Sequence, residues 1–375
     1  MQNKKKLLTI LGTRPEIIKM SCVLEKFEKY FNSVVIHTGQ NYNYYLNNIF
    51  FKQLKIKKPD YFLNCGKKTS IQTISSVLQK IEKVLIKEKP DAVAVYGDTN
   101  SCLSVIAAKK LKIPIFHFEA GNRSFDQNVP EEINRKIVDH LSDVNFVLTE
   151  HARRNLLSEG LPADRIFKTG SHLFEVLEKY KFFINNSKIL KKEKLKHKKY
   201  ILYSFHREEN VDNIINLKKI MQGINFLARK KKIPIIVSTH PRIRKKIINY
   251  KFDRLVKFKK PFGFIDYVFL QKNAYCVVSD SGTITEESAL LNFPAITLRK
   301  SHERPEGMDS GILIMSGLEP KNVFLSMEIV VDIFKKADRK IEITDNMNNF
   351  PSNQIIKVIS SYIDFINENV WKKYY

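Results

Sequence analysis

The sequence predicts an α/β protein made of two doubly wound, Rossmann-like units. Short apolar runs alternate along the chain with amphipathic runs of helical spacing, and the apolar runs are continuous instead of alternating with polar residues. Continuous apolar strands are typical of parallel sheets that helices cover on both faces. A chain of 375 residues is also too long for one ordinary core, so two domains are expected.

The first unit is expected to span residues 1–171. One helix is expected over 70–89, and others are expected to begin at Pro15, Ser101 and Glu131. Pro15 suits a first helical turn, and apolar residues recur at helical spacing within 70–89. The apolar runs predict strands at LLTILG (7–12), SVVIHTG (33–39), DAVAVYGD (91–98), IPIFHFEA (113–120) and NFVLTE (145–150).

The second unit is expected to span residues 172–353. It begins with a helix and a lysine-rich stretch, 187–199, in which no strand is expected. A last amphipathic helix is expected from 354 to about 371. Strands are predicted at 200–206, 233–241, 256–261, 274–281 and 294–301, and helices at 213–229, 264–272 and 283–292.

The composition limits the class of protein. A formal charge of +25 is typical of nucleic-acid binders, but the lysines are spread along the chain and the dense block at 187–199 has no interleaved aromatic residues. A basic field would equally attract an anionic small substrate. No run of about 18 apolar residues exists, and the four scattered cysteines form no CxxC pair. We therefore expect no membrane span and no disulfide framework, and the cytoplasm is the expected compartment.

The most distinctive polar residues lie at the carboxyl ends of predicted strands. In open α/β sheets, ligands bind in the crevice outside these ends. Two such units would aim their residues into one cleft, so we expect the active site between the domains. The residues are Arg14, Asp98, Glu119, His206, His240 and Ser281.

Two turns have the features of anion-binding sites. In GTRPE, Arg14 stands at a strand-to-helix turn where a glycine allows close approach of the backbone, which suits a diphosphate. In SDSGTITEE, Ser281 and Gly282 precede a helix whose N–H groups face an anion, and Glu287 could reach a ribose. A surface arginine and an N-capping serine are the structural alternatives, as a hydrogen-bonded strand-end histidine is for His206.

Asp98, Glu119 and Glu131 form the predicted acidic cluster. Glu119 ends a buried strand, and Glu131 stands across a glycine-containing loop at a helix start. Mutual repulsion and partial burial would raise one pKa, as a general acid at neutral pH requires. Structural ion pairs are the alternative for each residue. A metal site is a further alternative, although the chain has no DxD-like pair and no ligand-like His/Asp spacing.

Together these motifs resemble the non-hydrolysing UDP-N-acetylglucosamine 2-epimerase family. The resemblance runs from residue 7 to about 310. It implies a glycosyltransferase-B-like fold with the active site in the interdomain cleft, a C-terminal helix within 354–375 that packs back on the first domain, and a homodimer. It rests on GTRPE with Lys19, GDT (97–99), EAG…PEE…NR (119–135), HR (206–207), DSG…EE (280–287) and ERPE (303–306).

Within the family, the chain is most similar to the branch that acts on 6-deoxy-L-sugars. The similarity lies in GNRSFDQNVPEEINRKIVDHLSD (121–143), TEHARRNLLSEG (149–160) and KTGS (168–171). This branch converts UDP-2-acetamido-2,6-dideoxy-β-L-talose to UDP-N-acetyl-L-fucosamine, a capsule and O-antigen precursor. Members that act on UDP-N-acetylglucosamine typically read GLRTGD after EA and carry QH in the loop after the second strand. Here Asn41 replaces that histidine.

The resemblance implies an elimination mechanism. A base removes the C2 proton as UDP leaves C1, which gives a 2-acetamidoglycal, and UDP adds back while C2 is protonated on its other face. Two acid/base groups are needed, one for each face. No metal and no redox cofactor is required, so no cofactor is expected.

The family's motifs also imply roles for single residues. The uracil would lie near residues 264–267, and a structural or peripheral role is expected for His240 and Arg242. The catalytic candidates are Asp98, Glu119, Glu131 and His206. The UDP-binding candidates are Arg14, Lys19, His206, Tyr267, Ser281, Gly282 and Glu287. The sugar-binding candidates are Arg123, Asn134, Arg135 and Arg304.

Several other functions remain open from the sequence. The sugar could be UDP-N-acetylglucosamine, which would give UDP-N-acetylmannosamine, or the L-rhamno isomer of the 6-deoxy substrate. A hydrolysing 2-epimerase would instead release the free sugar. A glycosyltransferase of the same fold would share the SDSG…EE half but does not need three carboxylates.

Overall fold

The structure is a computed structural model that describes residues 4–39, 51, 53–239, 243, 246–301, 304–336 and 350–373. Its contacts divide the chain into two compact units, Met1–Lys179 with Asp345–Tyr375, and Tyr180–Thr344. Helix α7 (His172–Asn185) spans this division, whereas the sequence predicts a boundary near 172, where the helix begins.

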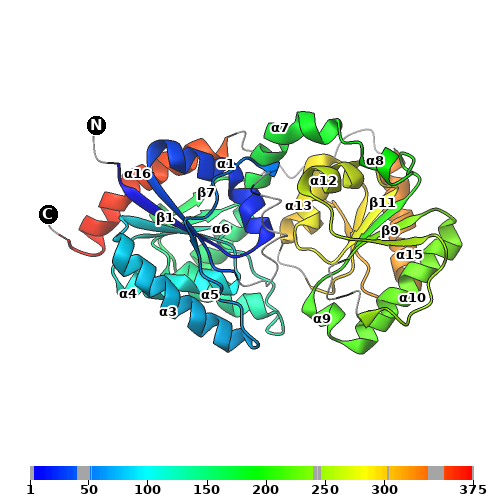
Figure 1. Ribbon diagram of the computed structural model, residues 1–375, viewed down its shortest axis with the longest axis horizontal. Helices are drawn as coiled ribbons and strands as arrows, with labels where there is room; N and C mark the ends of the chain where they lie inside the picture. Colours follow the sequence, from blue (N-terminus) through cyan, green and yellow to red (C-terminus); the bar gives the residue numbers. More distant parts are fainter. Residues whose placement is uncertain are drawn as a thin grey trace. The chain divides into compact units, whose positions relative to one another are not determined.

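The first unit contains a seven-stranded sheet in the order β3-β2-β1-β4-β5-β6-β7 (Figure 1). All its pairings are parallel. The first strand, β1, lies inside the sheet. The next two strands extend the sheet to one edge and the last four extend it to the other, which is the doubly wound order. The strands are β1 (Lys6–Leu11), β2 (Asn32–His37), β3 (Tyr61–Phe62), β4 (Ala92–Tyr96), β5 (Ile115–Phe118), β6 (Val144–Val147) and β7 (Ile166–Lys168).

Helices connect these strands and cover the sheet. The C-terminal helix α16 (Pro351–Asn369) lies against α1, so both ends of the chain belong to the first unit (Figure 1). The other helices are α1 (Arg14–Tyr30), α3 (Ser70–Glu88), η1 (Asn100–Ser104), α4 (Val105–Lys110), α5 (Pro130–Leu141), α6 (Glu150–Ser158) and η2 (Ala163–Arg165).

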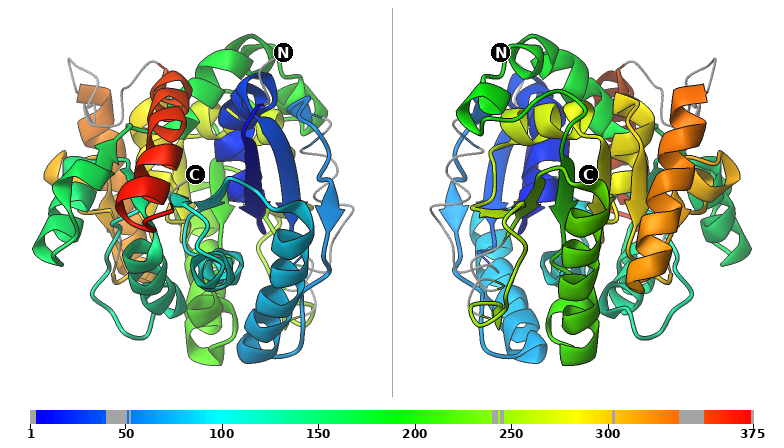
Figure 2. Two further views of the ribbon diagram at one scale, coloured as in Figure 1. Left: turned by 90° about the vertical axis from the view of Figure 1, so that its left-hand side faces the viewer. Right: turned by 90° about the vertical axis from the view of Figure 1, so that its right-hand side faces the viewer.

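The second unit repeats this winding with a six-stranded parallel sheet in the order β10-β9-β8-β11-β12-β13. Helices α10 and α15 lie side by side over it (Figure 2, right). The strands are β8 (Ile201–Ser204), β9 (Ile235–Ser238), β10 (Val256–Lys259), β11 (Cys276–Ser279), β12 (Ala295–Thr297) and β13 (Ile314–Met315). The helices are α8 (Ile189–Lys192), α9 (Glu208–Val211), α10 (Ile214–Lys231), α12 (Phe264–Asn273), α13 (Ile284–Leu291), α14 (Pro305–Asp309) and α15 (Pro320–Lys336).

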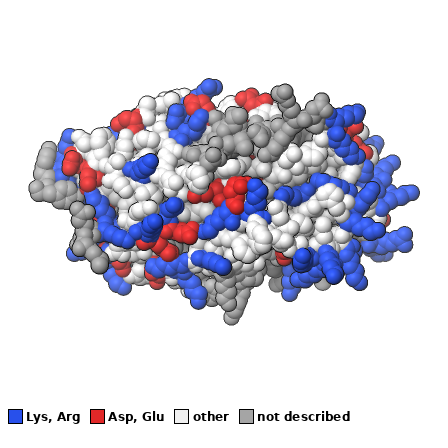
Figure 3. Space-filling view, turned by 90° about the horizontal axis from the view of Figure 1, so that it is seen from above, with Lys and Arg blue, Asp and Glu red and all other residues white. Residues whose placement is uncertain are grey.

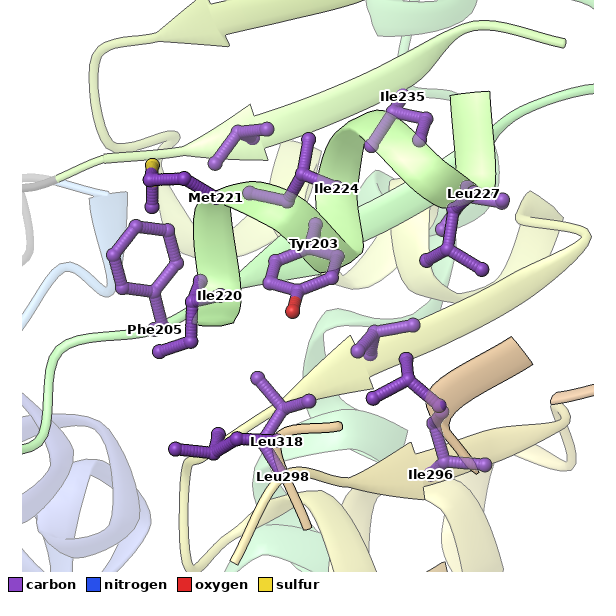
Figure 4. Packing of buried hydrophobic residues seen from close by; sticks show 14 of the residues in the cluster. Tyr203, Phe205, Ile220, Met221, Ile224, Leu227, Ile235, Ile296, Leu298 and Leu318 are labelled. Atoms are coloured by element: carbon purple, nitrogen blue, oxygen red, sulfur yellow. The ribbon is translucent and has the colours of Figure 1, made fainter. Parts of the chain in front are cut away.

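The core of the second unit shows why its strands are continuous apolar runs. Tyr203 and Ile235 come from adjacent strands, and Ile224 and Leu227 come from α10 above them; all four side chains are buried (Figure 4). The residues on the opposite face of the same strands, such as Leu202, are buried in a second cluster. A strand buried on both faces has no polar position to alternate with.

The predicted fold class is confirmed, and each predicted strand range overlaps a strand of the structure. The strand expected over 294–301 is only β12, and the helix expected from Ser101 begins as the 3-10 helix η1. Strands β3, β7 and β13, each two or three residues long, are too short to give an apolar run and were not predicted. Asn41, His240 and Arg242 lie outside the described residues.

Many of the lysine and arginine side chains, which give the chain its high positive charge, lie on the surface. Figure 3 shows Lys and Arg side chains over much of one face, with acidic side chains grouped near its middle. All four cysteines are buried and free. Within the described part of the chain, no helix is long and apolar enough to cross a membrane.

Candidate active site

The first unit brings three predicted site residues to neighbouring strand ends. Strands β1, β4 and β5 are adjacent and parallel, so their carboxyl ends meet at one edge of the sheet. Arg14 follows β1 as the first residue of α1, Asp98 follows β4, and Glu119 follows β5. This edge is where open α/β sheets bind their ligands.

Glu119 is held in an unusual backbone conformation by a buried ion pair. Its φ is +63°, in the left-handed region that residues other than glycine rarely adopt. The carboxylate Oε2 lies 2.8 Å from Nζ of Lys19, whose side chain is only 4% exposed. Strain of this kind clusters at functional sites, because the surrounding structure must enforce it. Lys19 thus contacts the central acid/base candidate.

Asp98 is ion-paired with α5. Both Nε and Nη2 of Arg135 lie 2.8 Å from its Oδ2, and the Arg135 side chain is buried. Asn134 donates through Nδ2 to the backbone oxygen of Asp98 at 2.9 Å. Two of the predicted sugar-binding residues therefore hold the turn that carries Asp98.

The loop between Glu119 and α5 is closed by Glu132. Its carboxylate accepts hydrogen bonds from the backbone N–H groups of Ser124 and Phe125 and from Arg135. Burial acts to raise the pKa of Glu132, but these hydrogen bonds outweigh it and lower that pKa. Glu131, its neighbour, is half-buried in the first turn of α5. Of the two glutamates, Glu132 is therefore the one that closes the loop.

Arg123 does not fit the predicted contact with a sugar. Its guanidinium has no exposed surface and donates to Glu159 through Nε and Nη2 and to Asp139 through Nη1, each at 2.7 Å. Gly121 lets the same loop pack closely against α6, because a Cβ at this position would lie 2.3 Å from the backbone oxygen of Ala152. The geometry gives Arg123 a structural function in this loop.

Glu16, in the GTRPE turn, is a buried carboxyl group that the sequence reading did not single out. Its oxygens accept from Gly12 N at 2.6 Å and from the hydroxyls of Thr13 and Thr99 at 2.8 and 3.0 Å. These contacts join the turn that carries Arg14 to the turn after β4. Desolvation raises the pKa of Glu16 to about 7, although the hydrogen bonds act to lower it.

Glu16 should make the stability of the protein depend on pH. A carboxyl whose pKa is raised on folding stabilises the folded state fully below its unfolded pKa of 4.5, and this contribution is lost as the pH rises through about 7. In Glu16→Gln the amide keeps the shape but cannot ionise. We expect the free energy of unfolding of the wild type to fall by about 2 kcal/mol relative to this variant between pH 5 and pH 8. Urea titrations across this range measure it, and parallel curves would contradict the assignment.

The second unit has its own buried carboxylate at the strand ends. Asp280, at the end of β11, is fully buried and accepts 3.0 Å hydrogen bonds from the backbone N–H groups of His206 and Arg207 and from Asn210 Nδ2. Nδ1 of His206 lies 3.2 Å from its Oδ1. Burial acts to raise the pKa of Asp280, but His206 and the hydrogen bonds lower it. Asp280 thereby fixes His206, whose side chain is 57% exposed and open to a ligand.

Ser281 and Gly282, predicted to form an anion site, lie half-buried in the turn before α13. Ser281 Oγ and Thr283 Oγ1 lie 2.9 Å apart, and Thr283 donates to Glu287 Oε1 at 2.8 Å. Tyr267 donates to Ser204 Oγ at 3.1 Å, at the end of the adjacent strand β8. These residues therefore gather at one edge of the second sheet.

Arg304 is buried beside two glutamates. Its Nη2 lies 3.5 Å from Oε2 of Glu286, and its Nη1 lies 3.7 Å from Oε1 of Glu306. The guanidinium, with Arg299, also lines a small cavity that Ser281 and Gly282 border. Arg304 thus lies next to the anion site of its own unit.

The set of donors does not resemble a metal centre. Among the described residues, no group of three His, Cys, Asp or Glu side chains is arranged to hold a metal ion. Asp98 and Glu119 are instead engaged with the cations of Arg135 and Lys19.

Comparison with known proteins identifies the family. A family model described as UDP-N-acetylglucosamine 2-epimerase matches residues 25–360. The chain belongs to this family. It is therefore an isomerase, a UDP-sugar 2-epimerase of the non-hydrolysing type.

The family's members cover the chain nearly from end to end. A UDP-N-acetylglucosamine 2-epimerase from Methanococcus maripaludis is 41% identical over 86% of this chain and 91% of its own length. The structure of such an enzyme from Rickettsia bellii is 48% identical, covers 99% of this chain and 100% of its own, and has a TM-score of 0.92. The enzyme from Methanocaldococcus jannaschii, in complex with UDP-GlcNAc and UDP, is 37% identical over 95% of this chain and 99% of its own, with a TM-score of 0.88. A relative from Pseudomonas aeruginosa, 35% identical over 83% of this chain and 88% of its own, is a UDP-2,3-diacetamido-2,3-dideoxy-D-glucuronate 2-epimerase.

Three buried or partly buried carboxylates near the predicted site, those of Glu16, Asp139 and Glu159, were not predicted from the sequence. Glu16 could have been found, because T-x-x-E before an apolar run is the signature of a capping box, which Thr13 and Glu16 form. Asp139 and Glu159 give no such local signal. Their partner Arg123 is 16 and 36 residues away.

Proposed function

We propose that this epimerase inverts C2 of UDP-2-acetamido-2,6-dideoxy-β-L-talose to give UDP-N-acetyl-L-fucosamine. The observation that carries the substrate is the loop after Glu119, which reads GNRSFDQN. Phe125 stands in this loop at a φ of +54° with 74% of its surface exposed. An exposed apolar ring in the loop between Glu119 and Glu131 suits the methyl group of a 6-deoxy sugar better than a hydroxymethyl group.

The reaction proceeds by elimination and re-addition. The C2 proton lies beside no carbonyl, so its removal is coupled to departure of UDP from C1, which leaves a 2-acetamidoglycal. UDP then returns to C1 while C2 receives a proton on the opposite face. Asp98, Glu119 and Glu131 supply the acid/base groups for the two faces, since general acid/base catalysis requires one positioned group on each side.

The second unit holds the departed UDP. We assign the diphosphate to Ser281, Gly282 and the exposed imidazole of His206, because N–H groups at a helix start and a positioned histidine favour an anion. Arg14, at the strand end of the first unit, is also assigned to the diphosphate. Glu287 is assigned to the ribose, and α12 around Tyr267 to the uracil.

UDP-N-acetylglucosamine is the second candidate substrate. It is favoured by the relatives, because proteins that are 41% and 48% identical to this chain are UDP-N-acetylglucosamine 2-epimerases. The Pseudomonas relative, however, acts on a different 2-acetamido sugar, so the sugar varies within the family. We further propose that the enzyme works in the cytoplasm as a homodimer and supplies capsule or O-antigen synthesis.

A single experiment tests mechanism and substrate together. The enzyme is incubated in deuterated water with each UDP-2-acetamido sugar, and the products are read by proton NMR. We expect deuterium at C2 of the epimerised product and the fastest turnover with the L-talo sugar. Complete retention of the C2 hydrogen would exclude elimination. Faster turnover of UDP-N-acetylglucosamine would replace the first candidate by the second.

A further inference from the structure

His117 is a buried histidine whose two ring nitrogens both face acceptors. It lies in β5, two residues before Glu119, and is 1% exposed. Its Nε2 lies 2.8 Å from the backbone oxygen of Gly97, and its Nδ1 lies 2.8 Å from Oδ1 of Asp139 in α5. The contact with Asp139 is within ion-pair distance, but its geometry is not that of a hydrogen bond.

This arrangement determines the protonation state. A neutral imidazole carries one N–H and one acceptor nitrogen, whereas a carbonyl oxygen and an ionised carboxylate can only accept. Asp139 already accepts hydrogen bonds from the guanidinium of Arg123 and from the N–H of Gly121, at 2.7 and 3.2 Å, so it faces the ring as an acceptor. The neutral ring would therefore place an acceptor nitrogen against an acceptor oxygen on one side.

The charges around the ring balance if it is a cation. The charged groups of this network are Asp139 on α5, Arg123 in the loop and Glu159 after α6, and Glu159 also contacts the partly exposed His140 at 3.0 Å. The fully buried Asp139 shares the one buried guanidinium with Glu159, so a charge on His117 would complete its neutralisation. An uncompensated buried charge is costly, and this favours the doubly protonated ring.

We propose that His117 carries a proton on both ring nitrogens in the folded enzyme and positions the two acid/base turns relative to each other. Through Gly97 it holds the residue before Asp98. Through Asp139, which accepts from Gly121 N, it holds the turn that follows Glu119. His117 touches no substrate in this proposal; it is a positioning residue. The positioning role rests on the proposed function of Asp98 and Glu119, whereas the charge of the ring does not.

The charge is tested first, on the unmodified enzyme. Nitrogen-15 NMR of histidine-labelled protein at pH 7.5 distinguishes imidazolium from either neutral tautomer. His37 is the internal control, because it is equally buried but its Nδ1 accepts from Gly39 N at 3.0 Å, and burial lowers its pKa to about 4. We expect protons on both nitrogens of His117 and on one nitrogen of His37. A neutral His117 overturns the proposal.

Two amide variants then separate the two arms of the bridge. In His117→Asn the amide N–H lies near the position of Nδ1, so the contact to Asp139 remains and the contact to Gly97 is lost. In His117→Gln the amide N–H lies near the position of Nε2 and keeps the contact to Gly97. Because the bridge holds both acid/base turns, kcat should fall roughly 100-fold in each variant, with KM unchanged in both.

The control variant is His140→Gln. His140 is the neighbour of Asp139 on α5 and contacts Glu159 at 3.0 Å from the surface, so its replacement should leave kcat unchanged. A wild-type kcat in either His117 variant, or a change confined to KM, overturns the positioning role. Poor folding of one variant does not obscure this result, because kcat is referred to active enzyme counted by UDP binding. A wild type that epimerises no UDP-sugar overturns the proposed function and its positioning arm, while NMR still decides the charge of the ring.

Discussion

Replacing Glu119 with glutamine should abolish turnover while UDP still binds. The amide has the shape of the carboxylate, and its oxygen can still accept from Nζ of Lys19, so the buried ammonium keeps a partner. An amide cannot take up the C2 proton. Removing one acid/base group typically costs 100- to 10,000-fold, so we expect kcat to fall by at least about 1,000-fold. Coupled assays of product formation measure turnover, and calorimetry measures the binding of UDP.

Glu150→Gln is the matched control for this variant. Glu150 is also a glutamate that follows a strand of the first sheet, at the start of α6, but its carboxylate lies 3.8 Å from Arg153 and Lys168 in a partly exposed ion pair. Such pairs contribute little to stability. The control should keep wild-type activity. If Glu119→Gln kept more than about a tenth of the activity, Glu119 could not be an essential acid/base group.

The fold was readable because its signals are local. A strand buried on both faces must be apolar throughout, and runs such as LLTILG and DAVAVYG carry this information within single segments. Helix starts were readable for the same reason, as at Pro130, which takes the first position of α5. Strands β3 and β13 have two residues each and are defined by their pairing with a neighbouring strand. A local sequence pattern carries no information about this pairing, so these strands could not be predicted.

The site was only partly readable, for a physical reason. The position of Glu119 at a strand end follows from the pattern, but its pairing with Lys19 joins residues 100 positions apart. The choice between Glu131 and Glu132 depends on which side chain turns inward to close the loop. Arg123 was predicted to contact the sugar, whereas its guanidinium lies in the interior with Asp139 and Glu159. An arginine in a loop after a strand has the same local sequence whether it faces a ligand or the interior.

The buried network around Arg123 predicts the second large effect. In Arg123→Met the side chain keeps much of its length but loses its charge, so Asp139 and Glu159 lose the cation between them. Breaking a buried ion pair by removing one partner costs about 3–5 kcal/mol. We expect the free energy of unfolding of the first unit to fall by that amount. Trp371, the one tryptophan of the chain, belongs to this unit, so its fluorescence in a urea titration follows the transition.

Arg153→Met distinguishes a buried network from a general effect of losing an arginine. Arg153 lies on α6 and its guanidinium is partly exposed, 3.8 Å from Glu150, so this variant should lose less than about 1 kcal/mol. A direct contact of Arg123 with the sugar predicts a different pattern, in which KM rises and the unfolding transition does not move. The guanidinium has no exposed surface and is paired with Asp139 and Glu159, so we expect the large loss of stability. Turnover should also fall, because Asp139 holds the turn that follows Glu119.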